Sequence, residues 1–166
     1  QLVKRGDVVA LTLNYRLGIL GFGHLKEYYG DRVDSNLGLR DQIAALEWVR
    51  DNIAEFGGDP ENITLFGESA GAICIAALLT SPRIKGLVKN AIIQSGSPDY
   101  VLTLAEAERL RTLYWPLLEL SHDQALWTLP AEHFLKAQHV ALKQCVQRGA
   151  HAHPMPLYGM TLIPVV

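Results

Sequence analysis

Blocks of apolar and polar residues alternate along the first hundred positions and predict strands and helices in turn. Residues 8–13 form a near-continuous apolar run, which is typical of a strand buried on both faces of a parallel sheet. Between residues 38 and 56, apolar side chains recur at steps of three and four, which predicts an amphipathic helix. Short β-branched runs at 62–66 and 91–94 predict two further strands. This alternation indicates a parallel sheet with helical crossovers, and therefore an α/β fold whose three strands are parallel neighbours.

The other stretches have less regular patterns. Residues 18–36 are rich in Gly and Tyr and lack a clear period, which predicts a long loop of a kind that often carries function. Residues 104–148 show a helical pattern broken at Pro116 and Pro130. Residues 149–160 hold prolines and glycines and predict another loop.

Length and composition fit one domain. The 166 residues are 49% hydrophobic and 19% charged, which suits a globular α/β protein and argues against disorder. We interpret residues 1–98 as the sheet core and residues 99–166 as a mostly helical segment of the same domain. The net charge of −2, without a dense basic run, indicates no nucleic-acid partner, and no apolar run reaches membrane-spanning length.

The two ends of the chain carry their own expectations. The chain begins at Gln1, without an initiator Met or a signal-peptide pattern, which favours a cytoplasmic location. It stops in the apolar stretch 162–166, so we interpret it as an internal piece of a longer protein, or as the only ordered or retained part of one. Cys74 and Cys145 lie in helix-like stretches, which favours buried free thiols over a disulfide.

The most informative motif is Gly67-Glu68-Ser69-Ala70-Gly71, a G-x-S-x-G sequence. The predicted strand at 62–66 precedes it, and an apolar run at 72–79 that can turn helical follows it. A strand, a sharp turn and a helix form the context of a nucleophile elbow, which strains the serine backbone and exposes its hydroxyl. An inert serine in a glycine-rich turn is the alternative interpretation.

Each neighbour of Ser69 has an expected role in that elbow. Gly67 and Gly71 leave room where a Cβ would strike the strand or the helix. The N–H of Ala70 opens the helix and is expected to point at an oxyanion. Glu68 is adjacent to Ser69 in sequence, so its side chain should point elsewhere, and an electrostatic role is favoured over that of a general base.

Other side chains leave alternatives open. His151 and His153 follow Ser69 in the chain with acids between, an order that permits a complete triad within the chain. The same two imidazoles could ligate a metal, although no third ligand is indicated and a surface loop is the alternative. Four aromatic residues either line a substrate pocket or pack in the core: Tyr28, Tyr29, Trp115 and Trp127.

Several longer stretches add a family resemblance, dense over residues 8–98. They are Asn14-Tyr15-Arg16-Leu17-Gly18, Asn36-Leu37-Gly38-Leu39 with Asp41-Gln42, Phe56-Gly57-Gly58-Asp59-Pro60, Phe66-Gly67-Glu68-Ser69-Ala70-Gly71 and Gln94-Ser95-Gly96-Ser97-Pro98. In order and spacing they resemble the type-B carboxylesterase and cholinesterase family, in its bacterial para-nitrobenzyl esterase-like branch. The resemblance implies a partial α/β-hydrolase fold: central parallel strands, flanking helices and the nucleophile elbow.

The resemblance also implies a reaction and its residues. Ser69 matches the nucleophile of a serine hydrolase that cleaves carboxylic esters through an acyl-enzyme, and Ala70 matches the oxyanion-hole donor after it. Glu68 matches a buried acid beside the nucleophile, and Ser95 a serine behind the triad. The implied partner is a small-molecule ester, and no metal or organic cofactor is implied.

Departures from the family pattern limit what the chain is expected to do alone. The family's glycine-rich oxyanion loop precedes the strand at 8–13, and its triad acid and histidine lie well beyond Val166. We therefore expect a central fragment that is inactive by itself. The family often has Gly where this chain has Ala72.

Two other functions remain open. A non-catalytic interaction domain on the same fold typically loses the serine that is kept here as Ser69. An inert fragment is the third possibility. The sequence indicates neither the preferred ester nor the oligomeric state.

Overall fold

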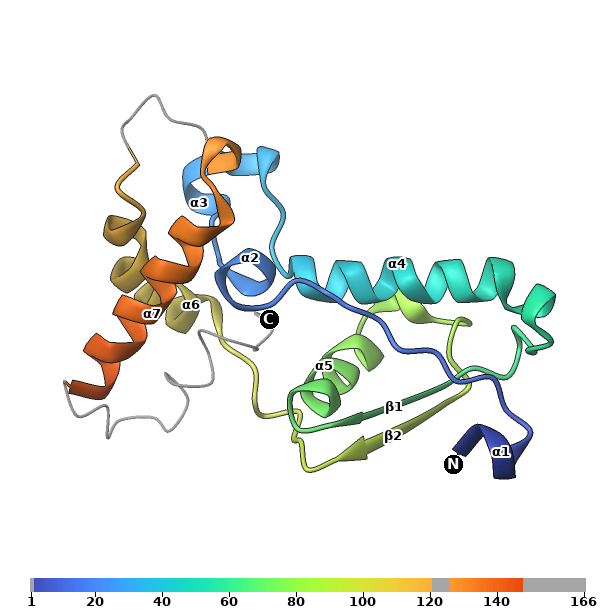
Figure 1. Ribbon diagram of the computed structural model, residues 1–166. Helices are drawn as coiled ribbons and strands as arrows, with labels where there is room; N and C mark the ends of the chain where they lie inside the picture. The colour runs from blue at the N-terminus through green and yellow to red at the C-terminus, as the bar shows by residue number, and fades with distance from the viewer. Residues whose placement is uncertain (1, 121–125, 148–166) are drawn as a thin grey trace. The chain divides into compact units, whose positions relative to one another are not determined.

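The computed structural model describes residues 2–120 and 126–147 (Figure 1). Its contacts divide the chain into two compact units, which are described separately below. As far as they are described, the first unit comprises Gln1–Tyr15 with Leu39–Pro98, and the second Arg16–Gly38 with Asp99–Val166. That both belong to one domain stays a prediction.

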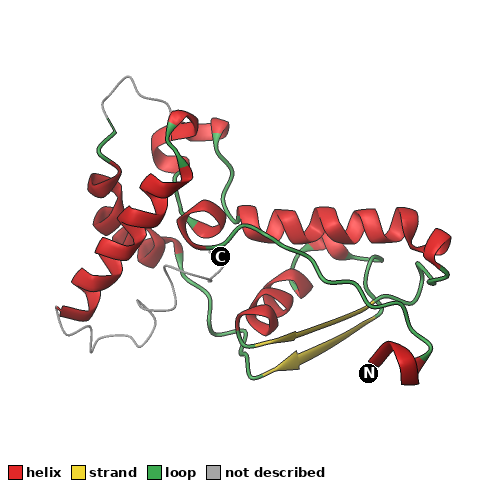
Figure 2. Ribbon diagram, viewed as in Figure 1, coloured by secondary structure: helices red, strands yellow, loops and turns green. Residues whose placement is uncertain are grey.

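The first unit holds a two-stranded parallel sheet (Figure 2). Strand β1, Thr64–Glu68, pairs with β2, Asn90–Gln94, in a register that sets Thr64 beside Asn90 and Glu68 beside Gln94. Helix α5, Ala70–Leu79, connects the strands and packs against both. The prediction that these two strands are parallel neighbours is confirmed, although β1 begins two residues later than the run at 62–66 indicated.

The helix predicted over residues 38–56 is confirmed. Helix α4, Leu37–Asn52, continues into a 3-10 helix, Ile53–Phe56, that ends at Gly57 in the left-handed conformation with φ 80°. Its apolar stripe packs in a core cluster through Leu46, which meets Leu78 of α5. Two short helices complete this unit: α1, Leu2–Gly6, and a 3-10 helix, Pro82–Ile84.

The strand predicted at residues 8–13 is wrong. This segment carries no strand, and its large apolar side chains are exposed, from 46% at Val9 to 37% at Leu13. A strand depends on ladder hydrogen bonds to a neighbour, and among the described residues β1 and β2 pair only with each other. Residues 8–13 therefore form no strand, although their composition favours one.

In the second unit, the loop predicted at 18–36 is wrong in part, because single helical turns form within it. Helix α2, Gly18–Phe22, is followed by α3, Lys26–Tyr29, and by a 3-10 helix, Gly30–Arg32. Ile19 is buried, and α2 packs against α7. These turns are too short for a helical period to show in the sequence, and tertiary packing stabilises them.

The helical prediction for residues 104–148 is confirmed where they are described. Helix α6, Leu104–Tyr114, continues into a 3-10 helix, Trp115–Leu118, and α7 spans Ala131–Gln147 after a 3-10 helix, Leu126–Thr128. Pro116 lies in the first 3-10 helix, and Pro130 stands immediately before α7. The buried residues of this unit's main cluster are Ile19, Leu25, Tyr114, Leu118, Phe134, Ala137 and Ala141.

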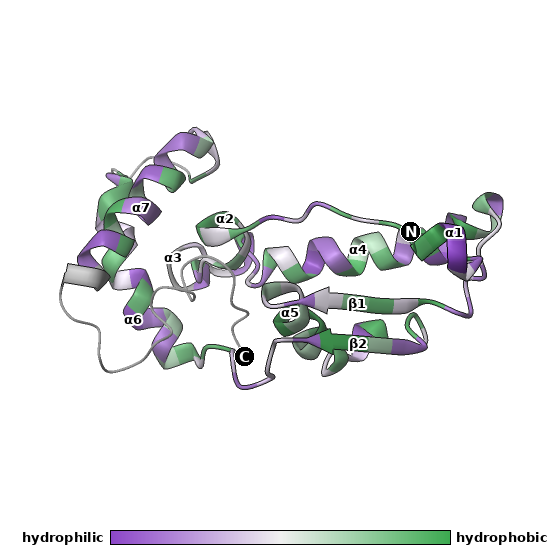
Figure 3. Cartoon of the chain, turned by 60° about the horizontal axis from the view of Figure 1, so that its bottom comes forward, coloured by the Kyte–Doolittle hydropathy of each residue, from purple (hydrophilic) through white to green (hydrophobic). Residues whose placement is uncertain are grey.

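One face of the sheet is bare among the described residues. Helix α5 covers the other face (Figure 3). Phe66 of β1 and its register partner Ile92 of β2 are 57% and 50% exposed.

Within the described part of the chain, no helix has the length and apolarity needed to cross a membrane.

Candidate active site

Ser69 occupies the turn between β1 and α5, so the predicted strand–turn–helix context is confirmed. Its backbone has φ 52° and ψ −115°, a conformation that costs a non-glycine residue about 1–3 kcal/mol. Two backbone hydrogen bonds hold it. The Ser69 N–H donates to the Gln94 carbonyl oxygen at 2.9 Å, and the Ile73 N–H donates to the Ser69 carbonyl oxygen at 3.0 Å. The strained turn is thus fixed by β2 as well as by α5.

The Ser69 side chain is exposed and makes no hydrogen bond to a described residue. Ser69 stands at the N-cap position of α5, where a serine hydroxyl commonly accepts a bond from the helix, but its side chain makes no capping bond. Ser81, at the N-cap of a 3-10 helix, does accept a bond from the Arg83 N–H. No described residue hydrogen-bonds to the Ser69 hydroxyl, which leaves it available to a base and an electrophile.

The two motif glycines differ in what surrounds them. A Cβ on Gly67 would lie 2.7 Å from the Gly71 carbonyl carbon and 3.0 Å from the Ala72 nitrogen, both backbone atoms that cannot move aside. A Cβ on Gly71 would meet nothing within 4 Å among the described residues. Among the described residues, the expectation that both positions need glycine for space holds for Gly67 and is wrong for Gly71, where an added Cβ meets open space.

The N–H of Ala70 is available as an anion-binding donor. Ala70 is the first residue of α5, and the first N–H groups of a helix have no acceptor within the helix. The same end carries the positive end of the helix dipole, which favours a developing negative charge. Because Ala70 follows Ser69 directly, one donor and the hydroxyl lie at the same turn.

Glu68 is exposed, although the family resemblance implied a buried acid at this position. It is the last residue of β1 and is exposed, and no described side chain pairs with its carboxylate. It stands on the same alternating face as Phe66, which no described element covers. The buried acid that the resemblance implies at this position is therefore not seen in the described part of the chain.

Ser95 lies one residue past β2, as Ser69 lies one residue past β1. It too has a positive φ, 54°, which is uncommon for a residue with a side chain. The last ladder pair joins Glu68 to Gln94, so each strand is followed by a serine with positive φ at the same edge of the sheet. This shared conformation was not foreseen from the sequence.

A buried thiol lies on α5, beyond the elbow. Cys74 is 1% exposed, is free, and hydrogen-bonds to the side chains of Gln42 and Tyr15. Burial raises the pKa of the Cys74 thiol, and those hydrogen bonds offset part of the rise. Burial, with the Cys74 thiol beside it, raises the pKa of Tyr15 to about 12. The sequence analysis missed this contact, although Tyr15 and Gln42 both lie in stretches that carry the family resemblance. The side chain of Cys145 lies outside the described residues.

The second unit contains a hydrogen-bonded network that the sequence analysis also missed. The Ser35 hydroxyl and His24 Nδ1 are 3.2 Å apart, and His24 Nε2 lies 3.2 Å from Glu108 Oε1. The buried Arg111 donates to Glu108 Oε2 at 2.9 and 2.6 Å, and the Tyr114 hydroxyl accepts from the His24 backbone N–H at 3.1 Å. Every ring nitrogen of His24 thus has a partner, and the network braces residues 24–35 against α6.

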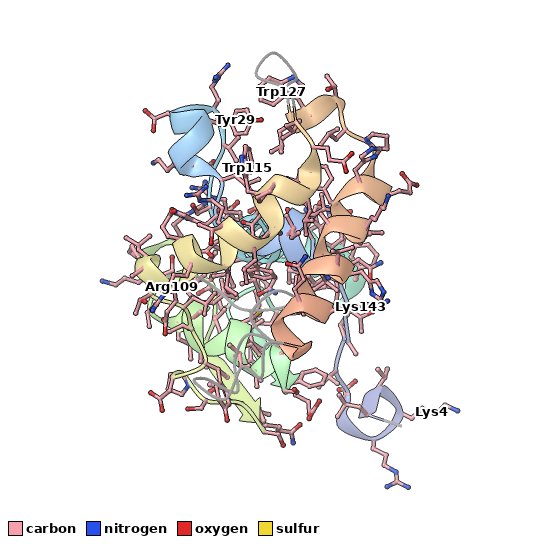
Figure 4. The ribbon with its side chains drawn as sticks, turned by 90° about the vertical axis from the view of Figure 1, so that its left-hand side faces the viewer. Lys4, Tyr29, Arg109, Trp115, Trp127 and Lys143 are labelled. Atoms are coloured by element: carbon pink, nitrogen blue, oxygen red, sulfur yellow. The ribbon has the colours of Figure 1, made fainter. Side chains whose placement is uncertain are left out.

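Three of the four aromatic candidates, Tyr29, Trp115 and Trp127, lie near one another in the second unit (Figure 4). The Tyr29 ring lies edge-on to Trp115 at 6.0 Å and 5.9 Å from Trp127, and the Arg32 guanidinium lies 5.9 Å from the Tyr29 and Trp127 ring centres. Trp127, 62% exposed, lines a hollow of about 490 Å³. Tyr29 and Trp115 pack against the core cluster, so this set divides between core and surface. The side chain of Tyr28 lies outside the described residues.

Two predicted candidates cannot be placed. His151 and His153, considered as triad or metal-binding residues, lie outside the described residues. In residues 2–120 and 126–147 no cluster of three or more His, Cys, Asp or Glu side chains is arranged to hold a metal ion.

Comparison with known proteins agrees with this geometry. The model of the Carboxylesterase family matches residues 1–113. Para-nitrobenzyl esterase of Bacillus subtilis (strain 168) is 47% identical over 139 residues, which cover 82% of this chain and 28% of that protein. Mouse neuroligin-2 is 52% identical over 97 residues, 58% of this chain and 11% of that protein. The crystal structure of the Geobacillus stearothermophilus carboxylesterase EST55 at pH 6.2 superposes with a TM-score of 0.83 at 39% identity, over 99% of this chain and 32% of that one.

The chain belongs to the carboxylesterase family. Its parallel strands, crossover helix and elbow are part of an α/β-hydrolase fold. The chain spans about a third or less of the length of the relatives it matches. The fold class inferred from the family resemblance is thereby confirmed.

Proposed function

We propose that this chain carries the nucleophile of a carboxylic ester hydrolase, with Ser69 as the attacking residue. The observation that carries the proposal is the elbow itself: an exposed serine with φ 52°, between a parallel strand and a helix, whose hydroxyl serves no structural bond. Membership of the carboxylesterase family and the likeness to a para-nitrobenzyl esterase support ester cleavage as the reaction.

The proposed chemistry proceeds in two halves. Ser69 Oγ attacks the ester carbonyl carbon, a base takes the hydroxyl proton, and the carbonyl electrons move to an oxyanion. The Ala70 N–H donates to that oxyanion, and one such donor contributes about 3 kcal/mol to the barrier reduction. The alcohol then leaves with the proton as the acyl–Oγ bond remains. Water repeats the sequence on the acyl-enzyme and releases the carboxylic acid.

The described residues supply only part of this machinery. They offer the nucleophile and one oxyanion donor, and no base hydrogen-bonds to Ser69 among them. We propose that a histidine, oriented by an acid, and further N–H donors reach the elbow from outside the described residues. Glu68 then acts through its charge beside Ser69, and Ser95 supports the edge of the sheet behind the nucleophile. That the 166-residue chain is inactive alone stays a prediction.

Hydrolysis of a p-nitrophenyl ester by the intact protein tests the proposal. Ser69→Ala should lower kcat by about 10⁴- to 10⁶-fold, because it removes the atom that forms the covalent bond to the acyl group. Ser81→Ala is the matched control, since that hydroxyl caps a 3-10 helix and should leave kcat unchanged. An intact, folded protein without esterase activity would instead support the alternative of a non-catalytic interaction domain on the same fold.

A further inference from the structure

Gly96, two residues beyond β2, lies against the start of α5. A Cβ built on Gly96 would be 2.6 Å from Ala72 Cβ, 3.0 Å from the Ser69 carbonyl oxygen and 3.1 Å from the Ile73 nitrogen. The last two atoms are the acceptor and donor of the 3.0 Å bond that opens the helix. Gly96 therefore covers the first hydrogen bond of the helix that begins at the candidate nucleophile.

We infer that Gly96 is a positioning residue for Ser69, and that Ala72 makes the tightest of the three contacts that require glycine at position 96. The inference rests on the proposed function for its effect on catalysis. Carbon atoms meet at about 3.5–4.0 Å, so 2.6 Å between two Cβ atoms requires a displacement. Ala72 is fully buried, and the other two contacts are backbone atoms, so neither side can yield by rotating a side chain.

A shift of the first turn of α5 that relieves this contact would displace the Ala70 N–H and the strained Ser69. A displacement of about 1 Å at reacting groups costs on the order of 100-fold in rate. Gly71 differs from Gly96. Although Gly71 belongs to the G-x-S-x-G motif, a Cβ built there meets nothing within 4 Å among the described residues. The spatial requirement behind the nucleophile thus lies partly outside the motif, in the coupling of residues 72 and 96.

The coupling predicts a rescue. In the intact protein, Gly96→Ala should lower kcat on a p-nitrophenyl ester about 100-fold with KM little changed, and should slow fluorophosphonate reaction at Ser69 by a similar factor. Adding Ala72→Gly removes the 2.6 Å contact and should restore kcat at least about 10-fold. Gly6→Ala is the matched control, because its Cβ would meet only Val8 at an ordinary 3.6 Å.

Amide hydrogen exchange at Ile73 gives a readout that does not depend on activity. Exchange should be faster in Gly96→Ala than in the wild type and should return toward the wild-type rate in the double variant. If Ser69→Ala keeps full activity, the proposed function fails, and Ile73 exchange alone then decides the coupling. A Gly96→Ala variant whose kcat and Ile73 exchange rate both equal those of the wild type would overturn the inference. So would a Gly96→Ala defect, or a failure to fold, that Ala72→Gly does not relieve.

Discussion

The backbone N–H of Ser69 donates to the carbonyl oxygen of Gln94 at 2.9 Å, which carries the β1–β2 ladder one residue past its last register pair. Immediately beyond that bond, Ser69 and Ser95 both adopt a positive φ, 52° and 54°. The backbone of the proposed nucleophile is therefore held by the neighbouring strand β2 as well as by its own strand β1.

The first prediction separates the two motif glycines by stability. Gly67→Ala should lower the free energy of unfolding by about 3 kcal/mol, because its Cβ would meet backbone atoms at 2.7–3.0 Å. Gly71→Ala should raise it by about 0.5–1 kcal/mol, since Gly71 lies within α5, its Cβ meets open space, and alanine favours a helix. Urea unfolding of the two variants measures both values. Equal destabilisation by both would contradict the geometry.

The second prediction concerns alkaline pH. Because the pKa of Tyr15 is raised to about 12 in the folded protein, the unfolded chain, with a tyrosine pKa near 10, loses its proton first. The stability that Tyr15 contributes is fully present below pH 10 and is lost as pH rises toward 12. The difference in unfolding free energy between wild type and Tyr15→Phe should hold constant up to pH 10 and then shift against the wild type. A constant difference up to pH 12 would contradict this burial.

The third prediction concerns the start of α6. The Thr103 hydroxyl accepts from the Glu106 N–H at 3.4 Å, and the Glu106 carboxylate accepts from the Thr103 N–H at 2.9 Å, which forms a capping box. Thr103→Ala should cost about 1 kcal/mol of unfolding free energy, and Thr103→Ser should restore most of it. Thr112→Ala, an exposed position later in the same helix, serves as the control. A Thr103→Ala variant as stable as Thr112→Ala would show that the box contributes nothing.

The fourth prediction concerns Cys74. Burial raises the pKa of its thiol and shields it from solvent, so the thiolate needed for alkylation is scarce at neutral pH. Iodoacetamide should leave Cys74 unmodified in the native protein and should modify it after urea unfolding, as read by peptide mass spectrometry. Rapid native alkylation would mean that α5 opens readily at Cys74.

Local patterns account for the parts of the fold that the sequence predicted. Helix α4 and the strand–turn–helix around Ser69 each follow from patterns in consecutive residues, and both are confirmed. The run at 8–13 shows the limit, because its β preference needs a neighbouring strand that the described residues do not provide. The single turns α2 and α3 carry too few residues for a period to show.

The site divides in the same way. The motif singled out Ser69 and Ala70 as candidates, but the contacts behind them join residues far apart in the chain. Gly96 against Ala72, Tyr15 against Cys74 and His24 between Ser35 and Glu108 all depend on tertiary packing, which no spacing encodes. The exposed Glu68 shows the converse, since its expected burial depends on a covering element that is not among the described residues.

The most direct test of the account is the site of covalent labelling in the intact protein. A fluorophosphonate reacts with an activated serine, and peptide mass spectrometry locates the adduct. The account predicts one adduct, on Ser69, which is absent from Ser69→Ala while the far-ultraviolet circular dichroism is unchanged. An adduct on Ser95 or Ser97 instead, or ester hydrolysis that persists in Ser69→Ala, would contradict it.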